Sequence, residues 1–339
     1  MKVAIIGLGF MGGMHAQIYT ALPGIDLVAV ADTSVADTRK KVADLGLAVQ
    51  VFPNLQALLD GTQVDIVDIC VPTNDHAQLA VAAAEAGKHL FIEKPLALTL
   101  AECATIQKAV EKAGVFAQVG QCIRFWPEYV ALQEFIESGQ GGALKSLSLL
   151  RRAARPAYSR EDWLNDGTRS GGAACDLHVH DTDFVLHLLG RPASVFSQGT
   201  SGRSGCDHIF TSYQYDDVAV VAEGGWDYPQ HYGFSMAFEA VFEHASVSWD
   251  STSGNPPTLV LQHQEPVPMD VRQPGPQAST TGEGNISSLG GYFNELEYFT
   301  NCLKANKAPA VATVAQATES IRVLLAELES AKTRQVSIL

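Results

Sequence analysis

Residues 2–12 read KVAIIGLGFMG, an apolar run followed at once by three glycines with the spacing GxGxxG. An uninterrupted apolar run is typical of a strand that is buried on both faces of a parallel sheet. A glycine-rich turn between such a strand and a helix is typical of a loop whose backbone N–H groups bind phosphate. The stretch therefore predicts an α/β nucleotide-binding fold at the start of the chain.

The residues after this turn continue the same pattern. Their periodicity predicts a helix over 14–22 and a second buried strand over 26–31, which is followed by Asp32. Asp32 lies 20 residues after Gly12, the spacing expected of a carboxylate that hydrogen-bonds the adenosine ribose of a dinucleotide. GxGxxG alone is a weak signal, and a glycine turn without a ligand is the alternative. The strand, the helix and the acid together favour the ligand.

Each residue of the motif has an expected role. Gly7 permits the tight turn, Gly9 lets backbone N–H groups approach the pyrophosphate, and Gly12 lets the helix lie close to the strand. Phe10 and Met11 complete the loop. We therefore expect these five residues to contact the cofactor.

Asp32 also indicates which cofactor binds. Its carboxylate would accept hydrogen bonds from the ribose hydroxyls and would repel a 2′-phosphate. Thr33 and Ser34 are not basic, and Arg39, the nearest cation, is expected inside the next helix. We therefore predict NAD rather than NADP.

The alternation of strands and helices continues to residue 119. Strands are expected at 49–52, 64–71, 88–92 and 115–119, and helices at 55–60, 77–86 and 99–113. This order is that of a doubly wound fold, in which ligands bind beyond the carboxyl ends of the strands. Loop chemistry or capping is the alternative for any single residue at that edge, but the set predicts cofactor contacts. The set is Pro72, Thr73, Asn74, His76, Glu93, Lys94 and Gln121, with Pro95 beside them.

Residues 171–190 read GGAACDLHVHDTDFVLHLLG and place many titratable groups among apolar ones. We predict a helix over 173–189. Four ionisable residues would share one face of it: Asp176, His180, Asp183 and His187. Ionisable groups on a buried helix must be paired or must line a cavity. A carboxylate beside an imidazole fixes its tautomer and makes it a base near neutral pH, so Asp176 and His180 are the candidate catalytic pair.

Two alternatives stay open for this helix. Asp176 and His180 could be a buried pair without a chemical role, and Asp183 and His187 are expected to be structural. His178, His180 and the aspartates could also bind a metal ion. On a helix, however, the side chains of His178 and His180 point in nearly opposite directions, so no metal is predicted.

The second half of the chain has a different pattern. Residues 193–262 alternate apolar and polar side chains, which predicts antiparallel strands with one face on helices. The other face would be exposed or would form a subunit interface. Residues 254–290, rich in Gly, Pro, Ser and Thr, predict a long loop or lid. Helices are expected at 292–303 and 314–332.

Arg124 and Trp163, which lie outside the helix predicted over 173–189, are further candidates for binding a substrate. Arg124 could reach a ligand, or it could form an ion pair where the two halves join. The ring of Trp163 would stack well on a sugar, although core packing is an equal alternative. Arg151, Arg152 and Arg155 form a basic cluster that could be a solvated rim or could bind a polyol or an acid.

Composition excludes several kinds of partner. The chain has 339 residues and a formal charge of −14, which argues against binding to nucleic acid or to an anionic membrane surface. No apolar run is long enough to span a bilayer. The six cysteines are scattered without a CxxC pair, which indicates free thiols rather than a disulfide scaffold and predicts a cytoplasmic location.

Three stretches in their order and spacing resemble the glucose–fructose oxidoreductase / inositol dehydrogenase family (Gfo/Idh/MocA). They are GLGFMG, VPTNDHAQLAVAAAEAGKHLFIEKPLA and GGAACDLHVHDTDFVLHLLG. The resemblance covers nearly the whole chain and implies a Rossmann domain at 1–122. It also implies an α/β domain for substrate binding and oligomerisation at 123–339, built on a large, mostly antiparallel sheet. The final helix could pack back on the first domain. Members of the family form dimers or tetramers through that sheet.

The resemblance also implies a reaction, the transfer of a hydride between NAD(P) and a hydroxyl or carbonyl carbon of a sugar, cyclitol or related polyol. Lys94, Asp176 and His180 match the catalytic residues of inositol dehydrogenases. His178 stands where the family often has glycine, so the shape and polarity of the substrate pocket could differ. Tyr292 matches a recurring family tyrosine that could touch the active site.

The expected mechanism follows from these residues. His180 would take the hydroxyl proton while hydride goes to the nicotinamide, and Lys94 would donate to the substrate oxygen. The predicted substrate contacts are Lys94, Arg124, Trp163, Asp176, His178, His180 and Tyr292. An NAD-dependent glycoside hydrolase and a non-catalytic dinucleotide-sensing regulator are the alternative functions.

Overall fold

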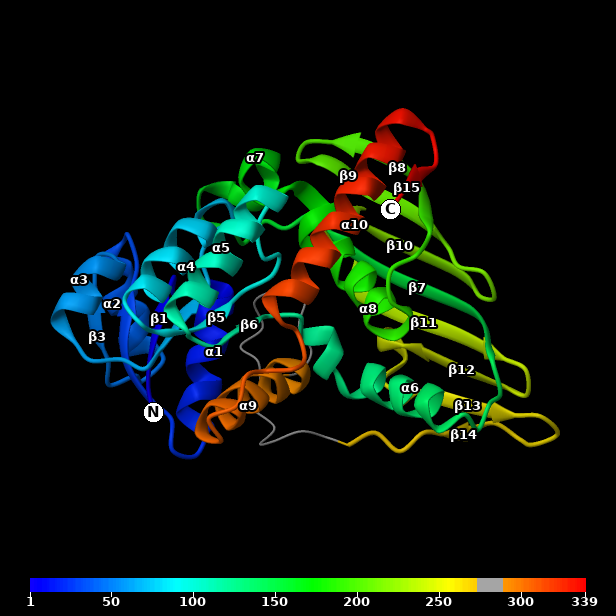
Figure 1. The fold of residues 1–339 in the computed structure, drawn as a ribbon, viewed down its shortest axis with the longest axis horizontal. Coiled ribbons are helices and arrows are strands. Elements are labelled where there is room, and N and C mark those ends of the chain that lie inside the picture. Colours follow the sequence, from blue (N-terminus) through cyan, green and yellow to red (C-terminus); the bar gives the residue numbers. More distant parts are fainter. Residues whose placement is uncertain (273–288) are drawn as a thin grey trace. The chain divides into compact units, whose positions relative to one another are not determined.

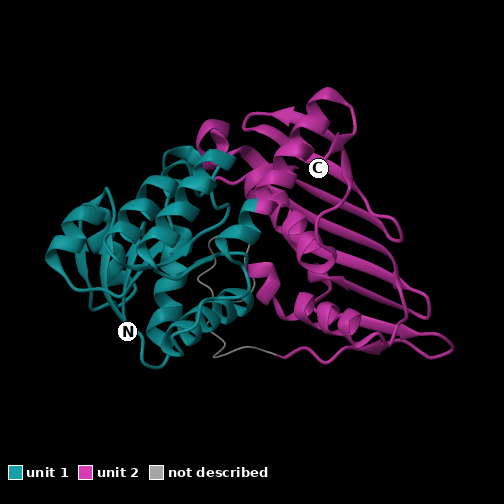
Figure 2. Cartoon of the chain, viewed as in Figure 1, with its two compact units in different colours: residues 1–121, 158–163, 275–318 teal, residues 122–157, 164–274, 319–339 magenta. Residues whose placement is uncertain are grey.

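The computed structural model describes residues 1–272 and 289–339. The chain forms two compact units (Figures 1 and 2). Unit 1 comprises residues 1–121, 158–163 and 275–318, and unit 2 comprises residues 122–157, 164–274 and 319–339. The predicted division into domains at 1–122 and 123–339 stays a prediction, and the compact units follow a less continuous path along the chain.

Unit 1 is built on a six-stranded sheet with the order β3-β2-β1-β4-β5-β6, and all its strand pairs are parallel. Its strands are β1 (Lys2–Ile6), β2 (Asp26–Ala31), β3 (Gln50–Phe52), β4 (Ile66–Ile69), β5 (His89–Ile92) and β6 (Ala117–Val119). This is the doubly wound Rossmann order, as the alternation of apolar runs and helices predicts. The strand order reverses direction between β1 and β4, so the loops after these two strands border a crevice.

The helices of unit 1 begin and end at residues suited to those positions. They are α1 (Phe10–Ala21), α2 (Val35–Asp44), α3 (Leu55–Gly61), α4 (His76–Glu85), α5 (Leu100–Ala113) and α9 (Gly290–Lys304), with the short turn η1 (Thr73–Asp75). Thr99 and Glu102 form a capping box at the start of α5, and Gly114 ends that helix in the left-handed conformation. The prediction that the first helix begins at residue 14 was wrong. It begins at Phe10 and includes Gly12 and Gly13.

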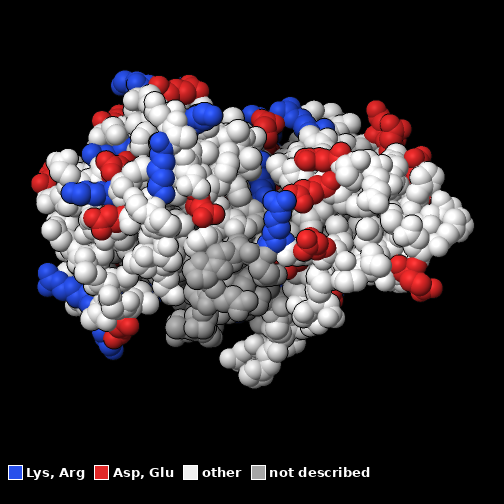
Figure 3. All heavy atoms as spheres, turned by 90° about the horizontal axis from the view of Figure 1, so that it is seen from below, with Lys and Arg blue, Asp and Glu red and all other residues white. Residues whose placement is uncertain are grey.

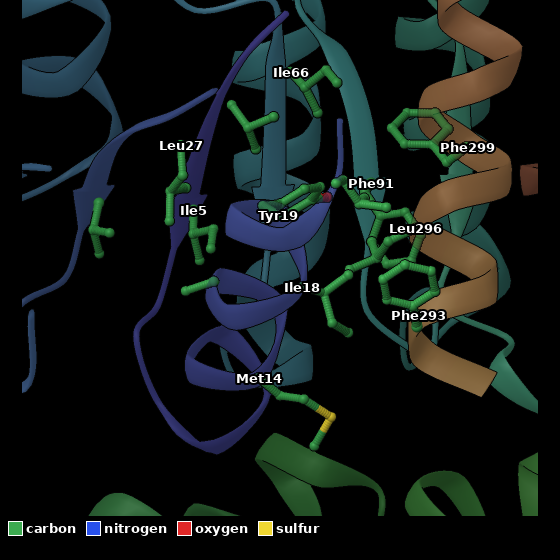
Figure 4. Close-up of a cluster of buried hydrophobic side chains, with 14 of the residues drawn as sticks. Ile5, Met14, Ile18, Tyr19, Leu27, Ile66, Phe91, Phe293, Leu296 and Phe299 are labelled. Atoms are coloured by element: carbon green, nitrogen blue, oxygen red, sulfur yellow. The ribbon is translucent and has the colours of Figure 1, made fainter. Parts of the chain in front are cut away.

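One hydrophobic cluster of unit 1 joins its first helix to a helix from the end of the chain (Figure 4). Ile18 and Tyr19 of α1 lie beside Phe91 of β5, and Leu296 and Phe299 of α9 pack on the same cluster. The ring centroids of Phe91 and Phe299 are 5.7 Å apart. α9 therefore contributes to the same core as the strands of the nucleotide-binding motif.

Unit 2 is built on a nine-stranded sheet with the order β14-β13-β12-β11-β7-β10-β9-β8-β15. Its strands are β7 (Leu144–Ala154), β8 (Ser194–Gly202), β9 (Gly205–Gln214), β10 (Ala219–Tyr228), β11 (Ser235–Phe242), β12 (Ala245–Asp250), β13 (Thr258–Leu261), β14 (Val267–Pro268) and β15 (Ser337–Ile338). Among the described strands of this sheet, β7 and β10 pair in parallel and all other neighbours pair antiparallel, so the sheet is mostly antiparallel, as predicted. The prediction of one long loop over 254–290 was wrong in part, because β13 and β14 lie inside it. Residues 273–288 of that loop lie outside the described residues.

Three helical segments of unit 2 lie on one face of this sheet (Figure 1): α6 (Pro127–Ser138), α8 (Val179–Leu189) and the end of α10 (Val314–Thr333). Unit 2 also contains the short helix α7 (Gly167–Ser170) and the short turns η2 (Cys122–Phe125) and η5 (Ser251–Ser253). The turn η3 (Arg160–Asn165) contains residues of both units. The prediction of a continuous α-helix over 173–189 was wrong at its start, because η4 (Ala174–His178) is a π-helical turn. Its hydrogen bonds span five residues, so the α-helical spacing argument does not apply between Asp176 and His180.

Charged side chains are mixed on the face of the molecule drawn in Figure 3, where acidic and basic residues lie among uncharged ones. Among the described residues, no helix is both long enough and apolar enough to cross a bilayer. All six cysteines have free thiols.

The glycine loop gives a matched pair of stability tests. A Cβ placed on Gly12 would lie 2.0 Å from the carbonyl oxygen of Gly7, whereas a Cβ on Gly9 would meet no atom within 4 Å. We therefore expect Gly12→Ala to lower the melting temperature clearly, because α1 would have to move away from the strand. Gly9→Ala should leave the melting temperature nearly unchanged. Thermal unfolding followed by circular dichroism tests this, and equal effects of the two variants would contradict it.

Candidate functional site

The loop between β1 and α1 has the geometry of a phosphate-binding turn. Gly7 has a φ of +89°, and its N–H donates to the carbonyl of Ala31 at 2.8 Å. A Cβ on Gly7 would lie 2.5 Å from the carbonyl oxygen of Cys70, so only glycine fits. Gly9 caps α1 and has no side chain to satisfy the first N–H groups of that helix. The open space at Gly9 and the helix N-terminus can therefore accept an anion.

Asp32 lies directly beside this loop. Its Oδ2 accepts a hydrogen bond from the N–H of Leu8 at 3.0 Å, and its Oδ1 accepts one from the N–H of Ser34 at 3.1 Å. The carboxylate is thus fixed at the end of β2, where the sequence motif places a ribose-binding acid.

Two cations at this loop were missed by the sequence analysis. Lys41 of α2 donates from Nζ to the carbonyl of Gly9 at 2.7 Å, and Arg160 contacts Asp32. The position of Lys41 nine residues after Asp32 carries no motif, and Arg160 comes from a distant part of the chain. Neither residue could be found from local periodicity.

The loops after β4 and β5 carry several residues that were predicted to contact the cofactor, and these residues differ in burial and in their hydrogen-bond partners. His76 is buried, with Nε2 3.0 Å from the carbonyl of Val71 and Nδ1 2.9 Å from the carbonyl of Pro95. Burial lowers the pKa of His76, although these carbonyl contacts oppose the shift. His76 therefore links the loop after β4 to the loop after β5 through its contacts with these two carbonyl groups. Thr73 is buried and Asn74 is exposed, where it donates to Asp75.

Gln121, beyond the end of β6, is a buried amide. Within the described residues, neither its side-chain nitrogen nor its side-chain oxygen has a hydrogen-bond partner. A buried amide without partners is costly, so this side chain is suited to a ligand that both accepts and donates.

Glu93 belongs to a buried cluster behind the nucleotide-binding edge. Its Oε1 lies 3.1 Å from Nε2 of His15, whose Nδ1 lies 2.8 Å from Oδ2 of Asp68. Glu295 of α9 faces the same imidazole, and Cys70 Sγ lies 3.4 Å from its Nδ1. Oε2 of Glu93 accepts the backbone N–H of Lys94 at 3.0 Å. Glu93 thus points into the core of unit 1 and fixes the peptide of the predicted catalytic lysine.

The pKa values of this cluster are strongly shifted. Burial alone would lower the pKa of His15, but the charge of Asp68 and the contacts with Cys70 raise it well above its usual value. Burial and the charge of Glu93 raise the pKa of Glu295 well above its usual range. An imidazolium between Asp68 and Glu93 beside a neutral Glu295 accounts for these contacts. Atoms of the same residues lie close enough to one another to hold a metal ion.

In unit 2, the π turn carries Asp176, which is partly exposed, and α8 carries His180, which is 7 % exposed. Arg124 forms a buried two-pronged ion pair with Asp183, at 2.7 and 2.8 Å, and its Nη1 lies 3.4 Å from Nδ1 of His187. Removing one partner of such a buried pair costs about 3–5 kcal/mol. Asp183 and His187 thus both have a partner in Arg124.

His178 faces the core of unit 2. It is fully buried, and its Nε2 lies 3.1 Å from Oε2 of Glu327 on α10. A Cβ on Gly224 of β10 would lie 2.7 Å from the Cβ of His178, so the helix packs closely on the sheet here. The role predicted for His178 in substrate binding stays a prediction.

The predicted basic cluster separates into three ion pairs. Arg151 pairs with Asp181 on the buried face, at 2.9 and 3.0 Å, whereas Arg152 pairs with Glu223 on the other face. Arg155 pairs with Asp207. Successive residues of a strand point to opposite faces, so neighbours in sequence do not form one patch.

Trp163 and Tyr292 both lie in unit 1. Trp163 ends the segment 158–163, and Tyr292 of α9 packs against the hydrophobic cluster of Figure 4. Both are partly buried, and their contacts with a substrate stay predictions.

Two regions of the sequence match two models of one family. Residues 1–121 match the model described as oxidoreductase family, NAD-binding Rossmann fold, and residues 129–248 match the GFO/IDH/MocA C-terminal domain. The chain belongs to the Gfo/Idh/MocA family. This confirms the resemblance stated for the sequence, the fold class and the class of enzyme, an NAD-dependent oxidoreductase.

Relatives in the family match the full length of the chain. Scyllo-inositol 2-dehydrogenase (NAD(+)) of Bacillus subtilis (strain 168) is 27 % identical over 97 % of this chain and 94 % of its own length. Inositol 2-dehydrogenase of Rhizobium meliloti (strain 1021) is 27 % identical over 100 % of this chain and 99 % of its own length. The solved structure of levoglucosan dehydrogenase in complex with NADH and levoglucosan superposes with a TM-score of 0.85 at 20 % identity, over 99 % and 98 % of the two chains.

The glycine loop and Asp32 fit the cofactor that the Gfo/Idh/MocA family requires. Gly9 leaves space where a side chain would stand, the N-terminus of α1 faces that space, and Asp32 offers acceptors to a ribose. Gln121 supplies a buried amide without a partner among the described residues. The donor set therefore suits a dinucleotide.

The buried cluster around His15 predicts how stability depends on pH. Glu295 has a raised folded-state pKa, so the folded protein retains this proton as the pH rises while the unfolded chain loses it, and stability falls. Glu295→Gln replaces the carboxyl group by an amide, which does not titrate in this pH range. The variant should therefore gain stability relative to the wild type between about pH 5 and about pH 8. Melting temperatures across this range measure the difference.

Glu297→Gln is the matched control, because Glu297 lies on the same helix but is only partly buried. Its difference from the wild type should stay nearly constant with pH. A constant difference for Glu295→Gln as well would show that this carboxyl does not titrate as described.

Proposed function

We propose that this oxidoreductase oxidises a CH–OH group of a sugar, cyclitol or related polyol with NAD. The observation that carries the proposal is the full-length match to inositol dehydrogenases together with Lys94, Asp176 and His180 at their motif positions. The levoglucosan dehydrogenase structure supports the fold. All three names describe substrates with ring hydroxyl groups.

In the proposed reaction, His180 accepts the proton of the reacting hydroxyl. A mostly buried imidazole can serve as a base near neutral pH when a carboxylate stabilises its cationic form, and we assign that role to Asp176. NAD, when bound, supplies the acceptor for the hydride that leaves the same carbon.

Lys94 is assigned to the substrate oxygen, where its ammonium group stabilises developing negative charge. The peptide of Lys94 is fixed by Oε2 of Glu93, and Glu93 is fixed by His15. This chain of contacts gives the lysine a defined position at the carboxyl end of β5, which is the edge where doubly wound folds bind ligands.

We further propose that the chain forms a homodimer or homotetramer through the sheet of unit 2. Four large apolar side chains lie on the face that the helices leave uncovered, and each is more than one third exposed: Phe196, Phe210, Val221 and Val241. An exposed apolar face of this kind is typical of an interaction surface. A cytoplasmic location is part of the same proposal, supported by the six free thiols.

The reaction is tested by measuring NADH formation with a panel of inositols, sugars and sugar acids. Lys94→Ala and His180→Ala should each lower kcat at least about a hundredfold, because each removes a group that acts on the substrate hydroxyl. Binding of NADH, followed by nicotinamide fluorescence, should persist in both variants. Wild-type turnover in either variant would contradict the assigned role. Turnover of a glycoside without net NADH would identify the hydrolase alternative.

The assembly is tested at the open sheet face. Val221→Glu places a charge at a side chain that is 47 % exposed on this face and should shift the protein toward monomers in size-exclusion chromatography with light scattering. Val336→Glu, at a valine that is 56 % exposed and lies outside the strands, is the control and should leave the mass unchanged. An unchanged mass for Val221→Glu would argue against this interface.

A further inference from the structure

A short segment from the middle of the sequence lies with the nucleotide-binding unit. Residues 158–163 belong to unit 1, although the chain on both sides of them belongs to unit 2. The ring of Tyr158 packs on that of Phe10, with their centroids 5.4 Å apart. Arg160 donates from Nη1 to Oδ1 of Asp32 at 3.2 Å. The segment thus contacts both the residue that begins α1 and the carboxylate that follows β2.

The backbone of this segment is strained directly after the arginine. Glu161 and Asp162 have φ values of 54° and 55°, in the left-handed region that side chains with a Cβ adopt at a cost. Such a conformation persists only where the surrounding structure imposes it. The position of Arg160 is therefore a feature of the fold rather than one of many equal loop conformations.

The hydrogen bonds of Asp32 limit what else this carboxylate can accept. A carboxylate offers about four acceptor positions, two on each oxygen. The N–H of Leu8 uses one on Oδ2, and the N–H of Ser34 and Arg160 use two on Oδ1. One acceptor position of the Asp32 carboxylate remains, whereas the 2′- and 3′-hydroxyls of an adenosine ribose need two acceptor positions. Arg160 therefore competes with one ribose hydroxyl.

We propose that Arg160 is a specificity-determining residue for the adenosine half of the cofactor, and that it narrows the preference for NAD over NADP. Its positive charge offsets the charge with which Asp32 would repel a 2′-phosphate. A guanidinium group presents five N–H donors in a planar fork that matches phosphate, and the contact with Asp32 uses one of them. The inference rests on the proposed placement of the adenosine ribose at Asp32.

The test is a titration of the full chain with NADH and with NADPH, followed by nicotinamide fluorescence, which needs no substrate. In Arg160→Ala, NADPH should bind about tenfold more weakly, because a charge-assisted contact to the 2′-phosphate is lost. NADH should bind as well as before or more tightly, because both ribose hydroxyls can then reach Asp32. The ratio of the two dissociation constants should therefore change by about tenfold or more.

Further variants make each outcome decisive. Arg160→Lys keeps the charge but loses the fork and should give an intermediate ratio. Lys40→Ala removes a charge from the exposed side of α2, and its ratio should stay within about twofold of the wild type. A wild-type ratio in Arg160→Ala, in protein with an unchanged melting temperature, would overturn the inference.

Asp32→Ala separates this inference from the proposal on which it rests. If NADH affinity falls in Asp32→Ala while the ratio in Arg160→Ala stays at the wild-type value, only the role of Arg160 is refuted. If NADH affinity does not change in Asp32→Ala, the ribose does not bind at this carboxylate, and both statements fail together.

Discussion

The close approach of α1 to β1 is the contact on which most of unit 1 depends, and it exists because Gly12 has no side chain. A Cβ there would lie 2.0 Å from the carbonyl of Gly7. Since the helix lies this close, its N-terminus faces the glycine loop, and His15 reaches Asp68 on β4. The hydrophobic residues of the same helix pack with those of α9. The anion-binding loop, the buried cluster around His15 and the hydrophobic core of unit 1 therefore all depend on the absence of a side chain at Gly12.

In unit 2, α8 and the turn before it carry several charged side chains that are buried. Asp181 and Asp183 of α8 each face an arginine, and His178 faces Glu327. Buried ion pairs contribute little net stability, but each is costly to break. Any rotation of α8 about its axis would leave several charges unpaired at once. The ion pairs therefore fix the orientation of the helix, and with it the direction in which His180 points.

The sequence predicted those features that depend on neighbouring residues. The strand, the glycine turn and the acid after β2 follow from local patterns, as do the bounds of α5 within one residue. The π turn at Ala174–His178 could not be predicted, because a sequence compatible with an α-helix also fits one wider turn.

Long-range contacts were also beyond local patterns. The sequence identified Arg124 as a candidate but left its partner open, and Asp183 is that partner. Glu93 was grouped with the residues of the ligand edge, whereas its carboxylate is held by His15 inside unit 1. Nothing near Arg160 indicates that it pairs with Asp32, since 128 residues separate them. Periodicity describes which face of an element is buried, not what lies against it.

The parallel pair at the centre of the large sheet has a consequence for synthesis. β7 ends at Ala154, but its two neighbours, β10 and β11, begin only at Ala219 and Ser235. A growing chain on the ribosome must therefore carry β7 with both edges unpaired until these distant strands emerge. Unpaired strand edges invite association with other chains. While this interval is being translated, the nascent protein therefore exposes two unpaired strand edges to other chains.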